Sequence, residues 1–170
     1  MDPHLKRLQD EVSVSIQGLS TKELRWHRPE KWCVAEILEH LYLTYTGTTK
    51  GFSRLLASGN AQRNVPTLRQ RLQAFVVTGA GYFPHGVKSP PVAMPRGLPS
   101  EKAIAEIVLR IAEMDEMMSC CAAKFGADTK VLDHPVLGPF SVSQWRKFHL
   151  VHGRHHLKQI RQIRSQAQKS

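Results

Sequence analysis

The sequence predicts an all-α fold, specifically a four-helix bundle with a long crossover between the second and third helices. Four segments carry apolar residues at spacings of three and four, which is the periodicity of one helix face. No segment shows sustained period-two alternation, so no strand is expected. A chain of 170 residues is long enough for one core, and we expect residues 1–170 to form a single domain.

The first two helices are predicted over residues 3–19 and 34–58. Each has one apolar stripe that faces the expected core. The stripe of the first contains Leu5, Leu8, Val12, Ile16 and Leu19, and that of the second contains Ile37, Leu41, Thr44, Thr48 and Leu55.

The last two helices are predicted over residues 101–125 and from Ser141 onward. Ser100 is the expected N-cap of the third, and Gly126 follows its end, where a glycine is typical. Ser141 with Gln144 forms a capping-box pattern for the fourth. Their stripes contain Ile104, Val108, Ile111, Met118, Ala122 and Phe125 in the third, and Trp145, Ile160 and Ile163 in the fourth.

The crossover is expected over residues 79–100. It is dense in glycine and proline ("GAGYFPHGVKSPPVAMPRG"), and a short helix in "TLRQRLQAFV" precedes it. Its glycines do not have the spacing of a phosphate-binding loop, and no strand precedes them.

The chain has a formal net charge of +10 and a pI near 9.9. Basic residues are spread along the sequence and are concentrated only over residues 146–169. No basic cluster is interleaved with aromatic residues, so we expect a solvated basic surface and no nucleic-acid partner.

The N-terminal residues lack the apolar stretch of a signal peptide, and no run of 18 apolar residues occurs. We therefore expect no membrane partner. Three cysteines without a C-x-x-C spacing indicate neither a disulfide framework nor a cysteine zinc site, which favours the cytoplasm.

The segment "WRKFHLVHGRHHLKQIRQIR" contains four of the nine histidines. In a helix, His156 lies about 20° and His152 about 60° from His149 around the axis, on the core face of Trp145. His155 lies outside that face and is expected to meet solvent. His152 and His156, four residues apart, have the spacing with which one helix can chelate a metal ion.

A third histidine, His40, lies on the apolar face of the second helix. Two interpretations stay open for it: a hydrogen-bonded core histidine, or a ligand that faces the same gap as the other two. Three neutral imidazoles with an open coordination position are typical of a catalytic metal site.

Two stretches resemble the DinB/YfiT-like superfamily. "HRPEKWCVAEILEHL" is similar to its second helix, and "HPVLGPFSVSQWRKFHLVHGRHHLKQI" is similar to its C-terminal segment with H-x-x-x-H. The resemblance implies a DinB-like four-helix bundle with His40, His152 and His156 as the metal ligands. It also implies a divalent metal ion, zinc or nickel, and a low-molecular-weight thiol as cosubstrate.

Three further residues carry alternatives. Cys33 stands where the superfamily commonly has a Ser or Thr cap, which weakens the cap or leaves a thiol near the site. His149 faces inward. It would replace one of the metal ligands, support a ligand histidine through an outer contact, or pack in the core with a hydrogen bond of its own. Asp115 interrupts the third stripe; it would orient a ligand or serve as a base, or it would pair with a basic residue, since an unpaired buried charge is costly.

The expected function is therefore a metal-dependent reaction on a small molecule: a thiol-dependent transfer or isomerisation, or a hydrolysis. The resemblance makes a homodimer plausible. The alternative is a non-catalytic four-helix module that binds metal, protein or nucleic acid, in which the inward histidines serve packing.

Overall fold

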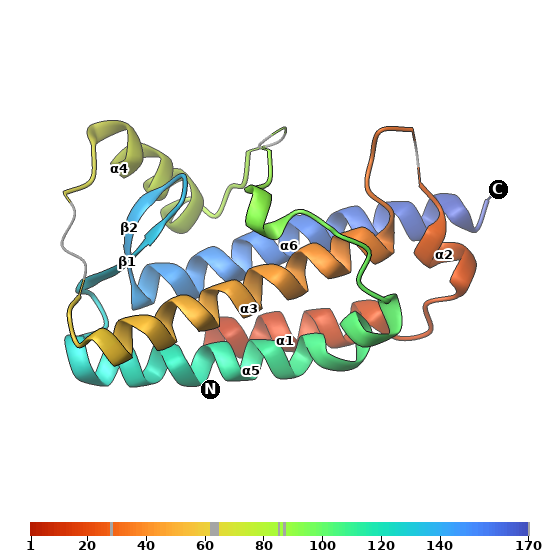
Figure 1. Ribbon diagram of the computed structural model, residues 1–170. Helices are drawn as coiled ribbons and strands as arrows, with labels where there is room; N and C mark the ends of the chain where they lie inside the picture. The colour runs from red at the N-terminus through yellow and green to blue at the C-terminus, as the bar shows by residue number, and fades with distance from the viewer. Residues whose placement is uncertain (28, 62–64, 85, 87, 170) are drawn as a thin grey trace.

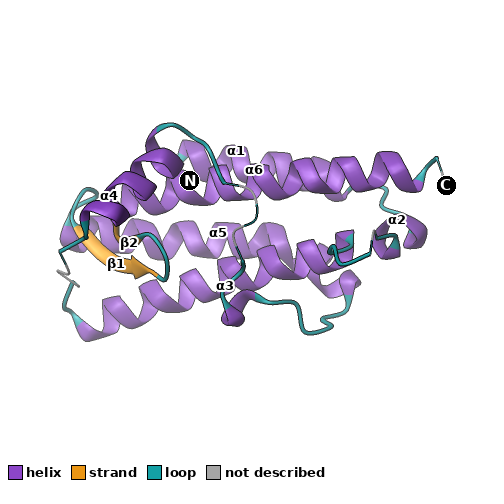
Figure 2. Cartoon of the chain, turned by 90° about the horizontal axis from the view of Figure 1, so that it is seen from above, coloured by secondary structure: helices purple, strands orange, loops and turns teal. Residues whose placement is uncertain are grey.

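The protein is predominantly helical, and four long helices lie side by side along its length in both views (Figures 1 and 2). The computed structural model describes residues 1–27, 29–61, 65–84, 86 and 88–169. Helix α1 packs on α6 and α5, and α3 packs on α5 and α6. The helices are α1 (Pro3–Ile16), α2 (Thr21–Arg25), α3 (Val34–Ser58), α4 (Leu68–Ala74), α5 (Ser100–Phe125) and α6 (Val142–Ala167).

The predicted apolar stripes contribute to the core between these helices, but the stripe of α5 is shifted by one position. Ala103, Ile107 and Cys121 are fully buried there, whereas the predicted residues Ile104, Val108, Ala122 and Phe125 are partly buried and pack against the core. Each of the four contributes fully buried side chains, such as Leu8, Leu41, Met118 and Ile160. Burial of these faces, through the hydrophobic effect, is what holds four amphipathic helices together.

The helix ends agree with the sequence except at two places. Ser141 and Gln144 form the predicted capping box, in which Ser141 Oγ accepts a hydrogen bond from the Gln144 amide at 3.3 Å. The N-cap of α5 is Pro99 and not Ser100, because the Pro99 carbonyl accepts the first helical hydrogen bonds. Helix α1 ends at Ile16, before Gly18, whose φ of +64° lies in the left-handed region.

A β-hairpin precedes α6, so the expectation of a purely α-helical chain was wrong. Strand β1 (Lys130–His134) pairs antiparallel with β2 (Gly138–Ser141). All four residues of β2 are buried and the pairing contains an irregularity, so the alternation that reveals a strand in a sequence is absent. Trp145 Nε1 donates to the Leu132 carbonyl at 3.1 Å and fixes the hairpin on α6.

The predicted short helix is α4, and it continues into a π-helical turn (Phe75–Gly79) that packs on α6. The chain then crosses from the side of α6 to that of α3, where a 3-10 turn (Pro91–Ala93) packs on α3 (Figure 2). The buried carboxylate of Glu39 on α3 accepts hydrogen bonds from the backbone amides of Arg96 at 2.7 Å and Gly97 at 3.0 Å. These hydrogen bonds fix the crossover on α3 through Glu39, the residue that precedes His40.

Helix α1 packs closely against α6 at Gly153. A Cβ atom at this position would overlap Leu8 Cδ1 and lie 3.3 Å from the Tyr45 hydroxyl. The absence of a side chain here lets Leu8 pack against the backbone of α6, next to His152. Among the described residues, no helix is both long and apolar enough to cross a membrane.

Candidate metal centre

His40 from α3 meets His152 and His156 from α6 in the interior of the protein. The Nε2 atom of His152 lies 3.2 Å from that of His40 and 3.1 Å from that of His156. One ring nitrogen from each histidine lies within 4.8 Å of those of the other two. All three side chains are buried, with between 3% and 7% of their surface exposed. The structure thus brings together the three residues that the sequence singled out as metal ligands.

Two of the rings are oriented by hydrogen bonds on their far side. His40 Nδ1 lies 2.8 Å from the Ala93 carbonyl, to which only a protonated Nδ1 can donate. His156 Nδ1 lies 2.8 Å from Gln159 Oε1 and donates to it in the same way. In neutral rings, the Nε2 lone pairs of His40 and His156 therefore point at the shared centre. Outer contacts of this kind fix the tautomer of metal-binding histidines.

The spacing of the nitrogens fits a divalent ion. Two nitrogens bound to one zinc ion at about 2.0–2.1 Å lie about 3.3 Å apart at the tetrahedral angle and about 2.9 Å apart at a right angle. The separations of 3.1 and 3.2 Å fall between these values. Lone pairs that face one another repel unless a cation or a proton lies between them. We conclude that His40, His152 and His156 can hold a metal ion.

Electrostatics keeps the three imidazoles neutral. Burial lowers the pKa of His40, and burial together with the neighbouring histidines lowers the pKa of His152 well below its ordinary value. Burial and the adjacent His40 lower the pKa of His156 to about 3. A neutral imidazole is the form that binds metal, so protons compete little with an ion for these nitrogens at neutral pH.

Aromatic rings line the centre. Trp32 contacts His40 at a ring-centroid distance of 5.1 Å, and Phe148 stacks on His152 at 5.3 Å. Phe83, from the crossover, lies 5.2 Å from His152 and 5.0 Å from His155. These rings limit the access of water. The sequence predicted that His155 meets solvent, but its side chain is half-buried because Phe83 packs against it.

His149 packs without a hydrogen bond to any described residue. It is fully buried, its ring stacks on Trp145 at 5.6 Å, and neither of its nitrogens has a partner. Burial, with His134 nearby, lowers its pKa to about 3. It is not part of the three-histidine group. A role in supporting a ligand histidine through an outer contact stays a prediction.

Asp115 on α5 forms an ion pair with Arg146 at 3.1 Å and accepts a hydrogen bond from the Asp2 backbone amide at 3.0 Å. These contacts correspond to the pairing alternative for this buried carboxylate. They join α1, α5 and α6, and none of them is with a histidine of the centre. A catalytic role for Asp115 stays a prediction that these contacts do not support.

Cys33 is the N-cap residue of α3, and its backbone amide donates to Glu36 at 2.8 Å. Burial raises the pKa of its thiol, so the side chain is a neutral thiol and not a thiolate. It precedes the helix that carries His40 and follows Trp32, which contacts that histidine.

Sequence reasoning missed the residues that orient the ligands. Gln159 lies three residues after His156, a helical neighbour spacing that could have revealed it. The Ala93 carbonyl and Phe83 carry no such signal, because both belong to an irregular crossover.

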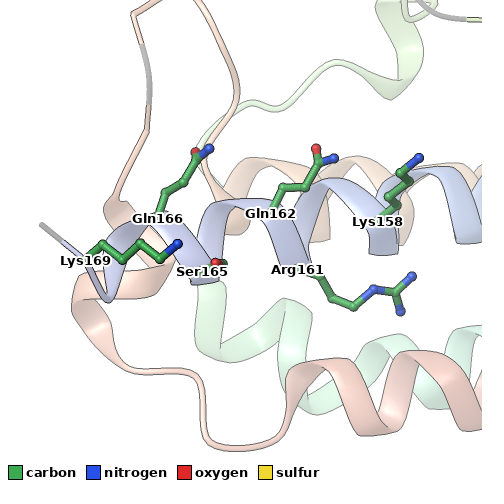
Figure 3. Close-up of a pocket in the computed structure, with 6 residues that line it drawn as sticks. All are labelled: Lys158, Arg161, Gln162, Ser165, Gln166 and Lys169. Carbon is green, nitrogen blue, oxygen red and sulfur yellow. The ribbon is translucent and has the colours of Figure 1, made fainter.

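Two basic residues of α6, Lys158 and Arg161, line a surface depression that contains no histidine of the centre. Figure 3 shows Lys158 and Arg161 projecting from α6 beside this open depression. Its lining residues are Lys158, Arg161, Gln162, Ser165, Gln166 and Lys169.

Fold and site together define a helical protein with a buried three-histidine group that can hold a metal ion. The chain belongs to a family described as "Protein of unknown function (DUF1569)", whose profile matches residues 4–163. Comparisons with curated proteins and with solved structures gave no match.

Proposed function

We propose that the protein is a divalent-metal enzyme with a DinB-like four-helix bundle, and that His40, His152 and His156 hold its metal ion. The reaction we propose is a thiol-dependent transfer or isomerisation, or a hydrolysis, on a small molecule. The observation that carries the proposal is the convergence of three Nε2 atoms from two helices, two of them with a tautomer set from outside the centre.

The resemblance to the DinB/YfiT-like superfamily supports the same ligands. The superfamily places a metal-binding histidine on its second helix and an H-x-x-x-H pair on its last, which correspond to His40 and to His152 with His156. In the structure these are helices α3 and α6. Zinc and nickel both accept imidazole ligands, and either fits a set of three histidines.

The residues of the chain have separable tasks in this proposal. The three histidines bind the ion, while Ala93 and Gln159 hold the rings of His40 and His156 in the binding tautomer. Three protein ligands leave a coordination position for a substrate group. A divalent ion held by the three histidines would supply Lewis acidity, the property that lets a water or thiol act as a nucleophile at neutral pH.

The walls of the centre are aromatic. The rings of Trp32, Phe83 and Phe148 surround the histidines: Phe148 stacks face to face on His152, and the other two rings are tilted against their histidines. We propose that these rings receive the apolar part of the substrate and exclude competing water. A cytoplasmic location and a homodimer complete the proposal and rest on the sequence and the resemblance alone.

The direct test is the metal content of the protein, purified without a histidine tag. Elemental analysis should find about one zinc or nickel ion per chain. The His40→Ala/His152→Ala variant should lose it. His4→Ala is the control, because His4 lies on α1 with 41% of its side chain exposed and is not part of the group, and this variant should retain the ion.

Circular dichroism shows whether the double variant is folded, so that lost metal is not confused with lost structure. A wild-type protein without metal after refolding with zinc or nickel would refute the metal site. Metal-loaded protein is then assayed with several low-molecular-weight thiols and an electrophilic acceptor. Bound metal without turnover on any thiol or ester would refute the enzymatic part and leave the metal-binding module.

A further inference from the structure

The surface formed by α4 and the crossover exposes an unusual share of the protein's large apolar side chains. Eleven such residues are exposed among the described part of the chain, and seven of them lie between residues 65 and 94. An eighth, Val136, lies in the turn of the hairpin on which α4 packs. The seven are Val65, Leu68, Leu72, Phe75, Tyr82, Val92 and Met94.

The exposed apolar residues of α4 and the first residue of the π-helical turn share one outward face. Leu68, Leu72 and Phe75 are spaced by four and three residues, and 84%, 64% and 66% of their surfaces are exposed. The opposite face buries Ala74, and Gln70 lies against Gly138 of the hairpin. The helix is therefore amphipathic and already packed on one side. Its apolar outer face has no partner among the described residues.

The stretch of chain that contains this face carries charge of one sign. Residues 40–100 contain no Asp or Glu but seven Lys and Arg, so this stretch contributes +7 of the net charge of +10. Within it, Arg69, Arg71, Lys88 and Arg96 are exposed. Arg69 and Arg71 lie about 90° and 70° to either side of the apolar stripe around the axis of α4. An apolar stripe with a cation on each flank is the pattern of a helix that lies in the plane of a membrane surface.

We propose that α4 and the adjoining crossover form a peripheral contact site for an anionic phospholipid surface, with Leu68, Leu72 and Phe75 inserted among the acyl chains and Arg69 and Arg71 at the headgroups. Figure 1 shows α4 and the crossover along the same edge of the molecule, opposite α1 and α5, so both can meet one plane. The sequence led us to expect no membrane partner because no segment could span a bilayer. Contact with the surface requires no span.

Charge decides between this partner and a second copy of the chain. Two copies joined through α4 would bring their Arg69 and Arg71 side chains together, residues 40–100 of either copy offer no carboxylate to pair with them, and like charges repel. A nucleic acid would match the charge but would leave Leu68, Leu72 and Phe75 uncovered. Anionic lipid matches both the charge and the apolar face.

The test is flotation of the full-length protein with vesicles of phosphatidylcholine alone or mixed with phosphatidylserine. The wild type should float with the mixed vesicles and be released by high salt, and it should bind neutral vesicles weakly. Leu72→Ser/Phe75→Ser should weaken binding at least tenfold, because both side chains would leave the acyl region. Arg69→Gln/Arg71→Gln should weaken it about 30-fold on mixed vesicles.

Two matched controls separate this site from general stickiness or charge. Val14→Ser/Leu109→Ser removes exposed apolar groups from α1 and α5, and Arg7→Gln/Lys102→Gln removes the same charge as the arginine pair. Both should bind like the wild type. No flotation of the wild type, or equal loss in variant and control, would overturn the proposal. So would a dimer in analytical ultracentrifugation that Leu72→Ser/Phe75→Ser dissociates while vesicle binding is unchanged.

Discussion

The Nε2 atoms of His40 and His152 lie 3.2 Å apart, although 112 residues separate the two histidines in the chain. This pair joins α3 to α6, and His156 completes the group from the same face of α6. The orientation of His40 depends in turn on the crossover, through the Ala93 carbonyl. The site can therefore be perturbed from positions that do not touch it.

Glu39 is the first such position. Glu39→Gln replaces one of the two carboxylate oxygens that accept the Arg96 and Gly97 amides with a donor, which loosens the segment that carries Ala93. We expect metal affinity to fall about tenfold, the lower end of what loss of an outer contact costs. Competition with a chromophoric chelator measures it. Glu101→Gln, an exposed change at the start of α5, is the control, and equal affinities in the two variants would contradict the role of Glu39.

Variants of Asp115 and Arg146 test whether the Asp115 carboxylate stabilises the fold or takes part in catalysis. Arg146→Ala leaves the buried Asp115 carboxylate with only the Asp2 amide, and we expect a loss of about 3 kcal/mol in unfolding free energy. Asp115→Asn should cost less and should leave metal content and turnover unchanged. Urea unfolding and elemental analysis measure the two effects. A large loss of turnover in a stable Asp115→Asn protein would instead support the hypothesis that Asp115 is a catalytic base.

Gly153 and Gly47 form a matched pair of helical glycines. Gly153→Ala forces a methyl group into Leu8, which is fully buried, and we expect destabilisation of about 1–3 kcal/mol. A Cβ atom at Gly47 meets nothing within 4 Å, so Gly47→Ala should stabilise α3 by about 0.5–1 kcal/mol. Chemical denaturation gives both values. In the background of Leu8→Ala, the penalty at Gly153 should shrink, and an unchanged penalty would exclude the contact with Leu8 as its cause.

His134 predicts how stability depends on pH. Burial lowers its pKa from 6.5 to about 4, so between these values the unfolded chain binds a proton that the folded chain does not. Stability from this group is complete above pH 6.5 and falls as the pH decreases to about 4, by about 3 kcal/mol at most.

In the wild type, His134 Nδ1 accepts hydrogen bonds from the backbone amides of Val136 and Leu137, and His134→Asn keeps a side-chain acceptor near them. Its stability should therefore vary less with pH than that of the wild type over this range. Thermal unfolding at a series of pH values compares them, and parallel curves would refute the assignment to His134.

Helical periodicity carried most of what the sequence could predict. The positions of Leu5, Leu41 and Ile160 follow from the 100° rotation of each residue in a helix, and so do the inward directions of His152 and His156. The bounds of α3 were predicted to the residue, because its core stripe runs without interruption between Cys33 and Gly59.

Contacts between distant segments could not be predicted in the same way. Arg146 lies 31 residues from Asp115, and no local pattern assigns this partner to a buried carboxylate. The Ala93 carbonyl is a backbone group whose position depends on the whole path of the crossover. The hairpin was missed because its strands are short and β2 is buried on both sides.

The sequence separation of His40 and His152 also matters for the unfolded chain. An ion bound by both closes a loop of 112 residues, whereas His156 adds almost nothing because it lies on the same helix as His152. Crosslinking a loop of about 100 residues removes chain entropy worth about 4–5 kcal/mol from the unfolded ensemble. An ion that stays bound to both histidines when the chain unfolds would favour the native state by restricting what the denatured chain can explore, and its removal would abolish that restriction.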